Sequence, residues 1–225
     1  MYIFDERLGP KNSDHTISYL NHYLSEIPSW IKRVHIFLDN AGSTNKNMYT
    51  MAWAMEMVQH HKFDIVRISF MIPGHTKFSV DQLFSRIAQS FNRSEFFNTT
   101  ELGKIAEPYA SVIIDEGDIV MEWRDCLTKY TKMPGIRSQH DFVFARQSST
   151  GNAQARVREL CHEGELKPST LKVAADHLAE EEAIPTVSYK SCGLIKELSS
   201  SKHAHLVQMY DNFIPADRRP AVLAS

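Results

Sequence analysis

The fold is decided by a stretch at residues 34–42, which reads VHIFLDNAG. Residues 34–38 are rich in β-branched and aromatic side chains, and this composition predicts a buried strand. Turn residues follow directly, beginning with Asp39, so the strand ends there. Open α/β sheets bind ligands beyond the carboxyl ends of their strands, which makes Asp39 a candidate site residue.

Strands and helices alternate around this stretch. The predicted order is a strand at residues 2–4, a helix at 14–27, a strand at 34–38, a helix at 45–61, a strand at 65–72 and a helix at 78–91. Such alternation favours parallel strands joined by crossover helices, and therefore an α/β fold.

Beyond residue 98 the pattern weakens. A short helix capped by Thr99 or Thr100, a helix at 122–130 and a last strand at 142–144 are predicted. The sequence then becomes rich in Ser, Ala, Glu and Lys. We therefore predict one domain at residues 1–147 and a loosely packed tail at 148–225, partly disordered or helical.

Composition narrows the function classes. The chain has 225 residues, a net charge of −2 and 43% hydrophobic residues, which is typical of a globular protein without a membrane span. Three cysteines without a CxxC pair, and no secretory signal, predict a location inside the cell, with the nucleus among the compartments that fit. No glycine-rich nucleotide-binding loop occurs, so no nucleotide cofactor is expected.

A zinc site is poorly supported. The ligand types are present beyond residue 160, but their spacing is irregular and no CxxC anchors them. The residues concerned are Cys161, His162, Cys192, His203 and His205.

A second loop, at residues 73–84, also follows a strand and opens a helix. It contains His75 and Asp81. If Asp39 and Asp81 converge at the ends of consecutive strands, they can hold Mg²⁺ for attack on a phosphodiester. Structural roles explain the same residues, since Asp39 suits a turn and Asp81 a helix N-terminus. On that interpretation His75 is a surface loop residue.

Positive charge gathers near the two acids. Between residues 32 and 93 there are eight Lys or Arg against four Asp or Glu. We take Lys46, Lys77 and Arg86, together with Asn45, as candidate nucleic-acid contacts. A solvated helix face accounts for the charges almost as well, and Asn45 also suits a helix cap.

Two motifs carry a resemblance. The segments FLDNAGSTNKN and PGHTKFSVDQLF resemble those of an uncharacterised eukaryotic family that looks transposase-derived. Its members carry an Asp-Asn-Cys/Ala-Gly-Gln-Asn-Lys-Asn run, then Gly-His-Thr/Ser with an acid shortly after. The match covers roughly residues 2–145, and it departs at Ser43-Thr44, where members commonly have Gly-Gln.

The element order is also similar to the second half of the ribonuclease H-like fold of transposases and integrases. That resemblance implies a three-layer core, with a mixed sheet and helices on its faces. Asp39 then matches the acid after the fourth strand and Asp81 the acid of the last helix, while His75 is a further ligand candidate. The first acid has no match, because residues 2–4 would be the third strand. A fragmentary gene, a remnant without catalysis and a different fold each explain this; we favour an N-terminally truncated or decayed domain.

The resemblance implies a transposase-derived, metal-dependent nuclease-like domain that acts on or binds DNA. The missing first acid implies that catalysis is incomplete and that Mg²⁺ binds weakly. Two alternatives stay open. One is a non-catalytic module that binds DNA or protein, and the other is a small-molecule α/β enzyme with His75 as general base.

Overall fold

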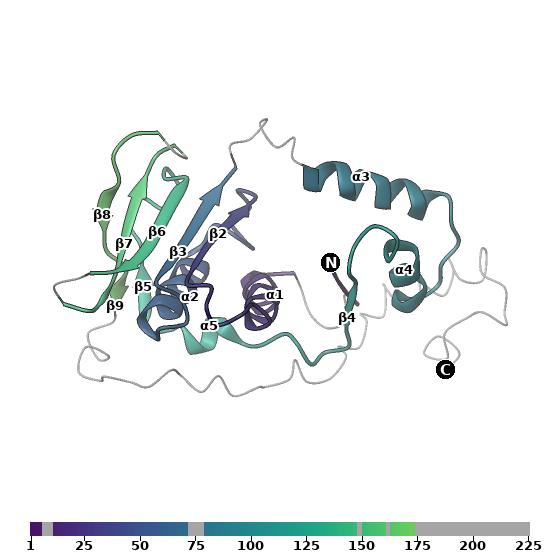
Figure 1. Cartoon of the computed structure of the whole chain (residues 1–225), viewed down its shortest axis with the longest axis horizontal. Helices are drawn as coiled ribbons and strands as arrows, with labels where there is room; N and C mark the ends of the chain where they lie inside the picture. The colour runs from purple at the N-terminus through teal and green to yellow at the C-terminus, as the bar shows by residue number, and fades with distance from the viewer. Residues whose placement is uncertain (6–10, 72–78, 148–149, 161–162, 174–225) are drawn as a thin grey trace, which may run out of the picture. The chain divides into compact units, whose positions relative to one another are not determined.

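The computed structural model describes residues 1–5, 11–71, 79–147, 150–160 and 163–173 of the chain (Figure 1). These residues form two compact units. The small unit comprises the described residues of 1–10 and 77–118, and the sheet unit comprises those of 11–76 and 119–173. No helix among the described residues has the length and apolar character needed to cross a membrane.

The sheet unit is built on a five-stranded mixed sheet (Figure 1). In spatial order its strands are β2 (Arg33–Leu38), β3 (Ile65–Phe70), β6 (Asp141–Arg146), β7 (Ala153–Arg158) and β8 (Lys167–Ser169). Strands β2 and β3 are parallel, and every other neighbouring pair is antiparallel. The described chain therefore has an α/β fold with a mixed sheet.

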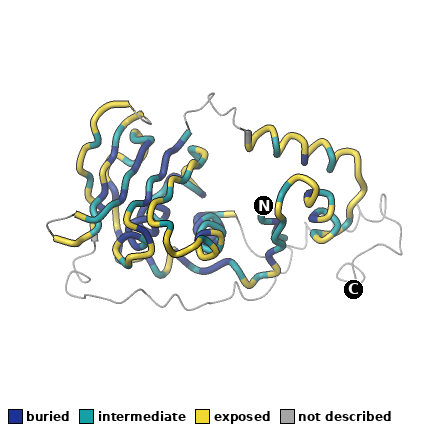
Figure 2. Tube along the Cα trace, in the orientation of Figure 1, coloured by how far each residue is buried: buried dark blue, intermediate teal, exposed yellow. Residues whose placement is uncertain are grey.

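One face of this sheet is the core face. The register places Val66 beside Phe144 and Ile68 beside Phe142, and all four side chains are buried. Helix α2 (Met48–Gln59) packs against this face and buries Trp53 completely. Alternate residues of the strands thus supply one apolar layer of the core and α2 supplies the other. Figure 2 shows buried positions concentrated in these elements.

Further elements complete the sheet unit. Helix α1 (Ser13–Ser25) lies against α2 and the short helix α5 (Trp123–Cys126). Strands β5 (Tyr130–Lys132) and β9 (Lys172–Val173) form a separate antiparallel pair.

Asparagine side chains cap the longer helices of the sheet unit. The predicted caps were the wrong residues, because Asn12 caps α1 in place of Ser13 or Asp14, and Asn47 caps α2 in place of Asn45. Each Asn is extended and accepts a backbone N–H from the first helical turn, which satisfies one of the otherwise unpaired donors there.

The small unit contains β1 (Tyr2–Phe4) and β4 (Ile113–Asp115), which form a parallel two-stranded sheet. Its helices are α3 (Ser79–Asn92) and α4 (Thr99–Ala106), the latter capped by Asn98 rather than by Thr99 or Thr100. The helices α3 and α4 contact one another, and α4 also contacts both strands.

Three sequence predictions need correction. Residues 2–4 form a strand as expected, but it pairs with β4 and does not join the sheet of β2. Strand β2 is an edge strand whose side chains alternate between exposed and half-buried, not a buried strand. Residues 153–169 continue the main sheet past the boundary predicted at 147, because β7 pairs with β6 along its whole length.

The last correction can be tested in solution. Val157 is buried on the core face, whereas Gln154 lies half-buried on the opposite face of the same strand. We expect Val157→Asp to lower the free energy of unfolding by about 3–5 kcal/mol, because it buries a charge. Gln154→Asp should cost below about 1 kcal/mol. Urea denaturation of the full chain measures both, and equal effects would show that β7 is not part of the core.

Candidate functional site

Asp39 lies at the carboxyl end of β2, where it organises the loop that leads to α2. Its Oδ1 accepts the backbone N–H of Ala41 at 3.0 Å and the side-chain amide of Asn45 at 2.6 Å. Thr16 of α1 donates in turn to Asn45 Oδ1 at 2.9 Å. The bond from Asp39 to Ala41 is an Asx turn, so the turn role of Asp39 is confirmed and its catalytic role stays a prediction.

Lys46 was predicted to contact nucleic acid, but the structure places it in the protein interior. Its side chain is buried, Nζ donates to the carbonyl of Arg137 at 3.0 Å, and the ammonium lies over the ring of Phe70. Burial lowers the pKa of Lys46. The side chain therefore ties the loop to the core and does not offer its charge at the surface.

The remaining predicted residues lie elsewhere. Asp81 is exposed in the first turn of α3, and Arg86 is exposed on the same helix of the small unit. Asp39 belongs to the sheet unit and Asp81 to the small unit, so the convergence of the two acids stays a prediction. His75 and Lys77 lie outside the described residues, as do the potential zinc ligands at 161, 162, 192, 203 and 205.

The metal site predicted at Asp39 and Asp81 draws on both units and stays a prediction. No group of three or more His, Cys, Asp or Glu side chains within the described ranges could hold a metal ion. At the end of β2, one oxygen of Asp39 is already occupied by Ala41 and Asn45. No catalytic step through a metal ion follows from this arrangement.

The outer face of the main sheet, opposite the core face, carries charged side chains on four of its strands. Register aligns Phe37, Ser69, Asp141 and Arg158 in one row across four strands. The next row of the same face contains His35, Arg67, Val143 and Arg156, and the third contains Arg33, Ile65, Ala145 and Gln154. Within these three rows, four arginines lie beside a single acid.

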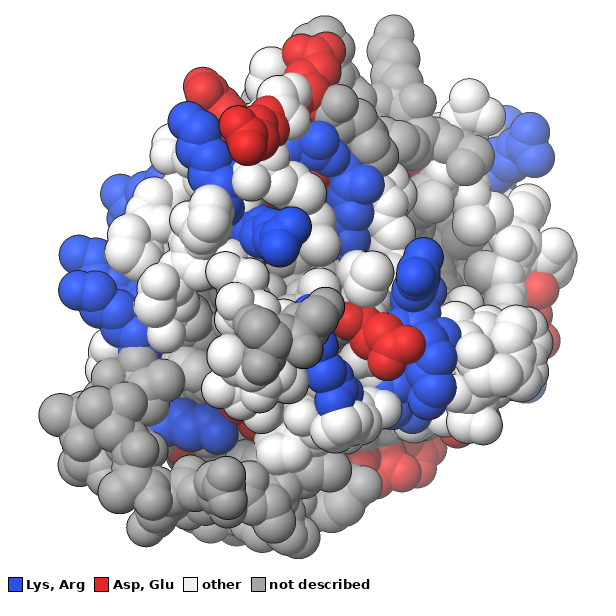
Figure 3. Space-filling model, turned by 60° about the vertical axis from the view of Figure 1, so that its left-hand side comes forward, with Lys and Arg blue, Asp and Glu red and all other residues white. Residues whose placement is uncertain are grey.

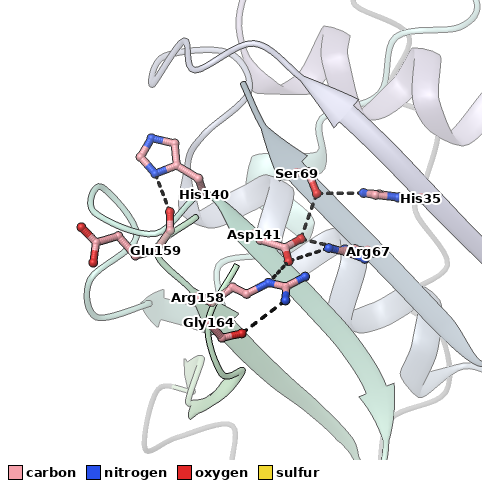
Figure 4. A network of polar contacts seen from close by, with 8 residues as sticks. All are labelled: His35, Arg67, Ser69, His140, Asp141, Arg158, Glu159 and Gly164. Carbon is pink, nitrogen blue, oxygen red and sulfur yellow. Dashed lines mark hydrogen bonds and ion pairs between the residues drawn. The ribbon is translucent and has the colours of Figure 1, made fainter. Parts of the chain in front are cut away.

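That acid, Asp141, is the centre of the network in Figure 4. It is fully buried and accepts Nε and a terminal nitrogen of Arg67, both at 2.8 Å, and Nε of Arg158 at 2.5 Å. The hydroxyl of Ser69 also donates to Asp141 at 2.8 Å. The Oγ atom of Ser69 lies 2.8 Å from Nε2 of His35. Four neighbouring strands are joined by these bonds.

The network also sets the titration of Asp141. Burial by itself raises the pKa of this carboxyl, but the hydrogen bonds from Arg67, Ser69 and Arg158 outweigh it and hold the pKa below its usual range. Asp141 is therefore ionised at neutral pH, and it compensates one of the two guanidinium groups.

The two units carry opposite charge. The described residues of the sheet unit hold 15 Lys or Arg against 11 Asp or Glu, whereas those of the small unit hold 3 against 8. Figure 3 shows Lys and Arg spread over much of one face of the molecule, with Asp and Glu between them at a few places. The basic character predicted near residues 32–93 therefore belongs to the sheet unit and not to α3.

A cavity of about 310 Å³ lies between α1, α2 and α5, and its wall is mostly apolar. Glu56 and His60 line it. The buried Glu56 accepts from Tyr130 Oη and His60 Nε2 and pairs with Lys129 Nζ at 3.0 Å. Burial and then the Glu56 charge raise the pKa of Tyr130, so its phenol stays protonated and donates. Because these three donors occupy Glu56, we assign the cluster to stability.

Comparison with known proteins adds one relationship. A family model described as Domain of unknown function (DUF7869) matches residues 1–163. The chain belongs to the DUF7869 family. No curated protein and no solved structure matches it. The DUF7869 match includes β2, β3, β6 and β7, the four strands that form the three outer-face rows.

Sequence reasoning missed the outer face of this DUF7869 protein. The signal was present as alternation, with Arg67 and Ser69 two residues apart in β3 and Arg156 and Arg158 in β7. Each pair projects from one face of its strand. That the two pairs share a face depends on β6, whose register could not be deduced from the sequence.

The Asp39 loop supplies one prediction. We expect Asn45→Ala to lower the free energy of unfolding by about 1–2 kcal/mol, because it removes the bonds to Asp39 and Thr16. Ser43 is exposed in the same loop, and Ser43→Ala should change the value by below about 0.5 kcal/mol. Chemical denaturation of the full chain measures both, and equal stabilities would show that Asn45 does not hold the loop.

A second prediction concerns Asp141. We expect Asp141→Asn to lower the free energy of unfolding by about 3–5 kcal/mol at pH 7, as measured by chemical denaturation, because two arginines lose their counter-charge. Asp64 is exposed before β3, so Asp64→Asn is a matched control with a small effect.

The effect of Asp141→Asn should depend on pH in one direction. A carboxyl whose pKa is lowered by folding stabilises the protein above its unfolded pKa, about 3.9, and this stabilisation is lost as pH falls through the folded value. The difference in free energy of unfolding between Asp141→Asn and the unaltered chain should therefore become smaller below about pH 4. A difference that stays constant from pH 7 to pH 3 would contradict an ionised Asp141.

Proposed function

We propose that this DUF7869 protein binds nucleic acid through the outer face of its main sheet, as a non-catalytic module. The observation that carries the proposal is the placement of four arginines from three strands on one face with a single, fully paired acid. A face with this excess of positive charge attracts the phosphate backbone and releases its counterions on binding.

The four arginines of this face differ in exposure and therefore in the role that we propose for each. Arg33 and Arg156 are exposed, so their guanidinium groups are available for phosphate oxygens. Arg67 and Arg158 are half-buried and held by Asp141, so they add positive potential at fixed positions. Strands lie about 4.8 Å apart, so the distance from β2 to β7 is roughly 14 Å.

We also propose an evolutionary origin for the domain. A transposase-derived origin and a ribonuclease H-like three-layer core are supported by the parallel β2-α2-β3 unit, with Asp39 at the end of its first strand. On this lineage Asp39, Asp81 and His75 mark a nuclease site, and DNA is the favoured nucleic acid. Mg²⁺ at Asp39 and Asp81, and a location in the nucleus, remain predictions of the same lineage. We favour binding without cleavage, because no group of three or more His, Cys, Asp or Glu side chains among the described residues is placed to hold a metal ion.

Fluorescence anisotropy of the full chain with a labelled oligonucleotide tests the proposal across a range of salt concentrations. We expect Arg33→Ala/Arg156→Ala to weaken binding and to reduce the magnitude of the salt slope by about 1.4–1.8, the value for two lost phosphate contacts. Mg²⁺ should leave the oligonucleotide uncut.

The matched control is Arg86→Ala/Arg93→Ala, which removes the same charge from exposed positions in α3 and directly after its last residue. It should leave affinity and slope unchanged. Binding that is lost equally in both double variants would assign the effect to net charge and not to the outer face. Absence of binding at low salt, or cleavage in Mg²⁺ that Asp39→Asn abolishes, would overturn the proposal.

A further inference from the structure

Two ring side chains lie side by side on the basic outer face. His35 and Phe37 both project from β2 to this face, and their ring centroids are 4.1 Å apart with an interplanar angle of 36°. Phe37 is 49% exposed although it is a large apolar side chain. The pair therefore presents a ring surface of two residues in direct contact with solvent.

Hydrogen bonds to neighbouring strands hold the His35 ring in place. Ser69 is buried beside Phe37 in the register, and its hydroxyl lies 2.8 Å from Nε2 of His35 while it donates to Asp141. Because Asp141 is itself fixed by two arginines, the imidazole is attached to the rigid part of the sheet. Figure 4 shows His35, Ser69 and Asp141 in this chain of contacts.

Positive charge surrounds the ring pair. Arg33 precedes His35 by two residues on the same face, and Arg67 lies opposite His35 on β3. Duplex nucleic acid offers its phosphates to such a surface but keeps its bases stacked on one another. A single strand offers phosphates and free base faces together, and bases stack on exposed rings of open sheet faces.

We infer that the outer face binds single-stranded nucleic acid, with a base stacked on Phe37 and His35 and the adjoining phosphates at Arg33 and Arg156. This inference rests on the proposed function and adds the class of nucleic acid to it. Phe37 and His35 contact the base, and Ser69 is a positioning residue that acts through His35.

The test compares oligo(dT) of 12 nucleotides, its RNA counterpart oligo(U), and a 12-base-pair duplex, each labelled and titrated with the full chain. We expect both single strands to bind more tightly than the duplex by at least about 5-fold, since the duplex gains phosphate contacts only. A difference in affinity between the two single strands shows which sugar this face prefers, and the inference requires that each of them still binds more tightly than the duplex.

Phe37→Ala should weaken single-strand binding by about 5- to 150-fold, the range for loss of one stacked base, and leave duplex binding and the salt slope unchanged. Phe37→Trp should restore affinity, and its added indole fluorescence should be quenched by the bound strand, which a purely structural role would not produce. The matched control is Tyr23→Ala, which removes a 62% exposed ring from α1 of the same unit.

The two proposals fail separately. If Phe37→Ala binds single strands as well as the unaltered chain does, or if the duplex binds as tightly, the stacking inference is overturned while the loss in Arg33→Ala/Arg156→Ala still supports nucleic-acid binding. If no oligonucleotide binds at low salt, both proposals are overturned. Circular dichroism of each variant establishes that a loss of affinity is not a loss of fold.

Discussion

A buried carboxylate is the constraint on which the sheet unit depends. Asp141 has no exposed surface, and it is stable as an anion only because Arg67, Arg158 and Ser69 supply its hydrogen bonds. Those partners come from β3 and β7, the strands on either side of β6. The same interaction therefore joins the parallel pair to the antiparallel strands and holds two guanidinium groups on one face of the sheet.

The two faces of this sheet have opposite characters. On the core face, α2 covers side chains such as Ile68 and Phe142, and the energy comes from apolar burial. On the outer face, four arginines and one acid leave an excess of positive charge that costs energy unless an anion shares it. The acidic small unit belongs to the same chain, so the net charge of −2 conceals a basic unit.

Local features were predictable where the physical cause is local. The alternating order up to residue 92 identified the positions of α2, β2 and β3, and the turn role of Asp39 followed from its residue type. Non-local features were not predictable in the same way. Lys46 reads as a surface charge in the sequence, yet it is buried over Phe70, because burial of an ammonium depends on a carbonyl 91 residues away, that of Arg137.

The sequence by itself determined which residues alternate along each strand and where each helix can begin, because these depend on neighbours a few positions apart. Only the tertiary structure decided that residues 2–4 join β4 and that Arg67, Asp141 and Arg158 meet. Strand order and register arise from contacts between segments that are not neighbours in the sequence, such as Arg67 and Asp141, which are 74 residues apart. A shift of register by one residue would move Arg158 to the core face, which the alternation of β7 disfavours, but that alternation does not identify the strand that lies beside β7.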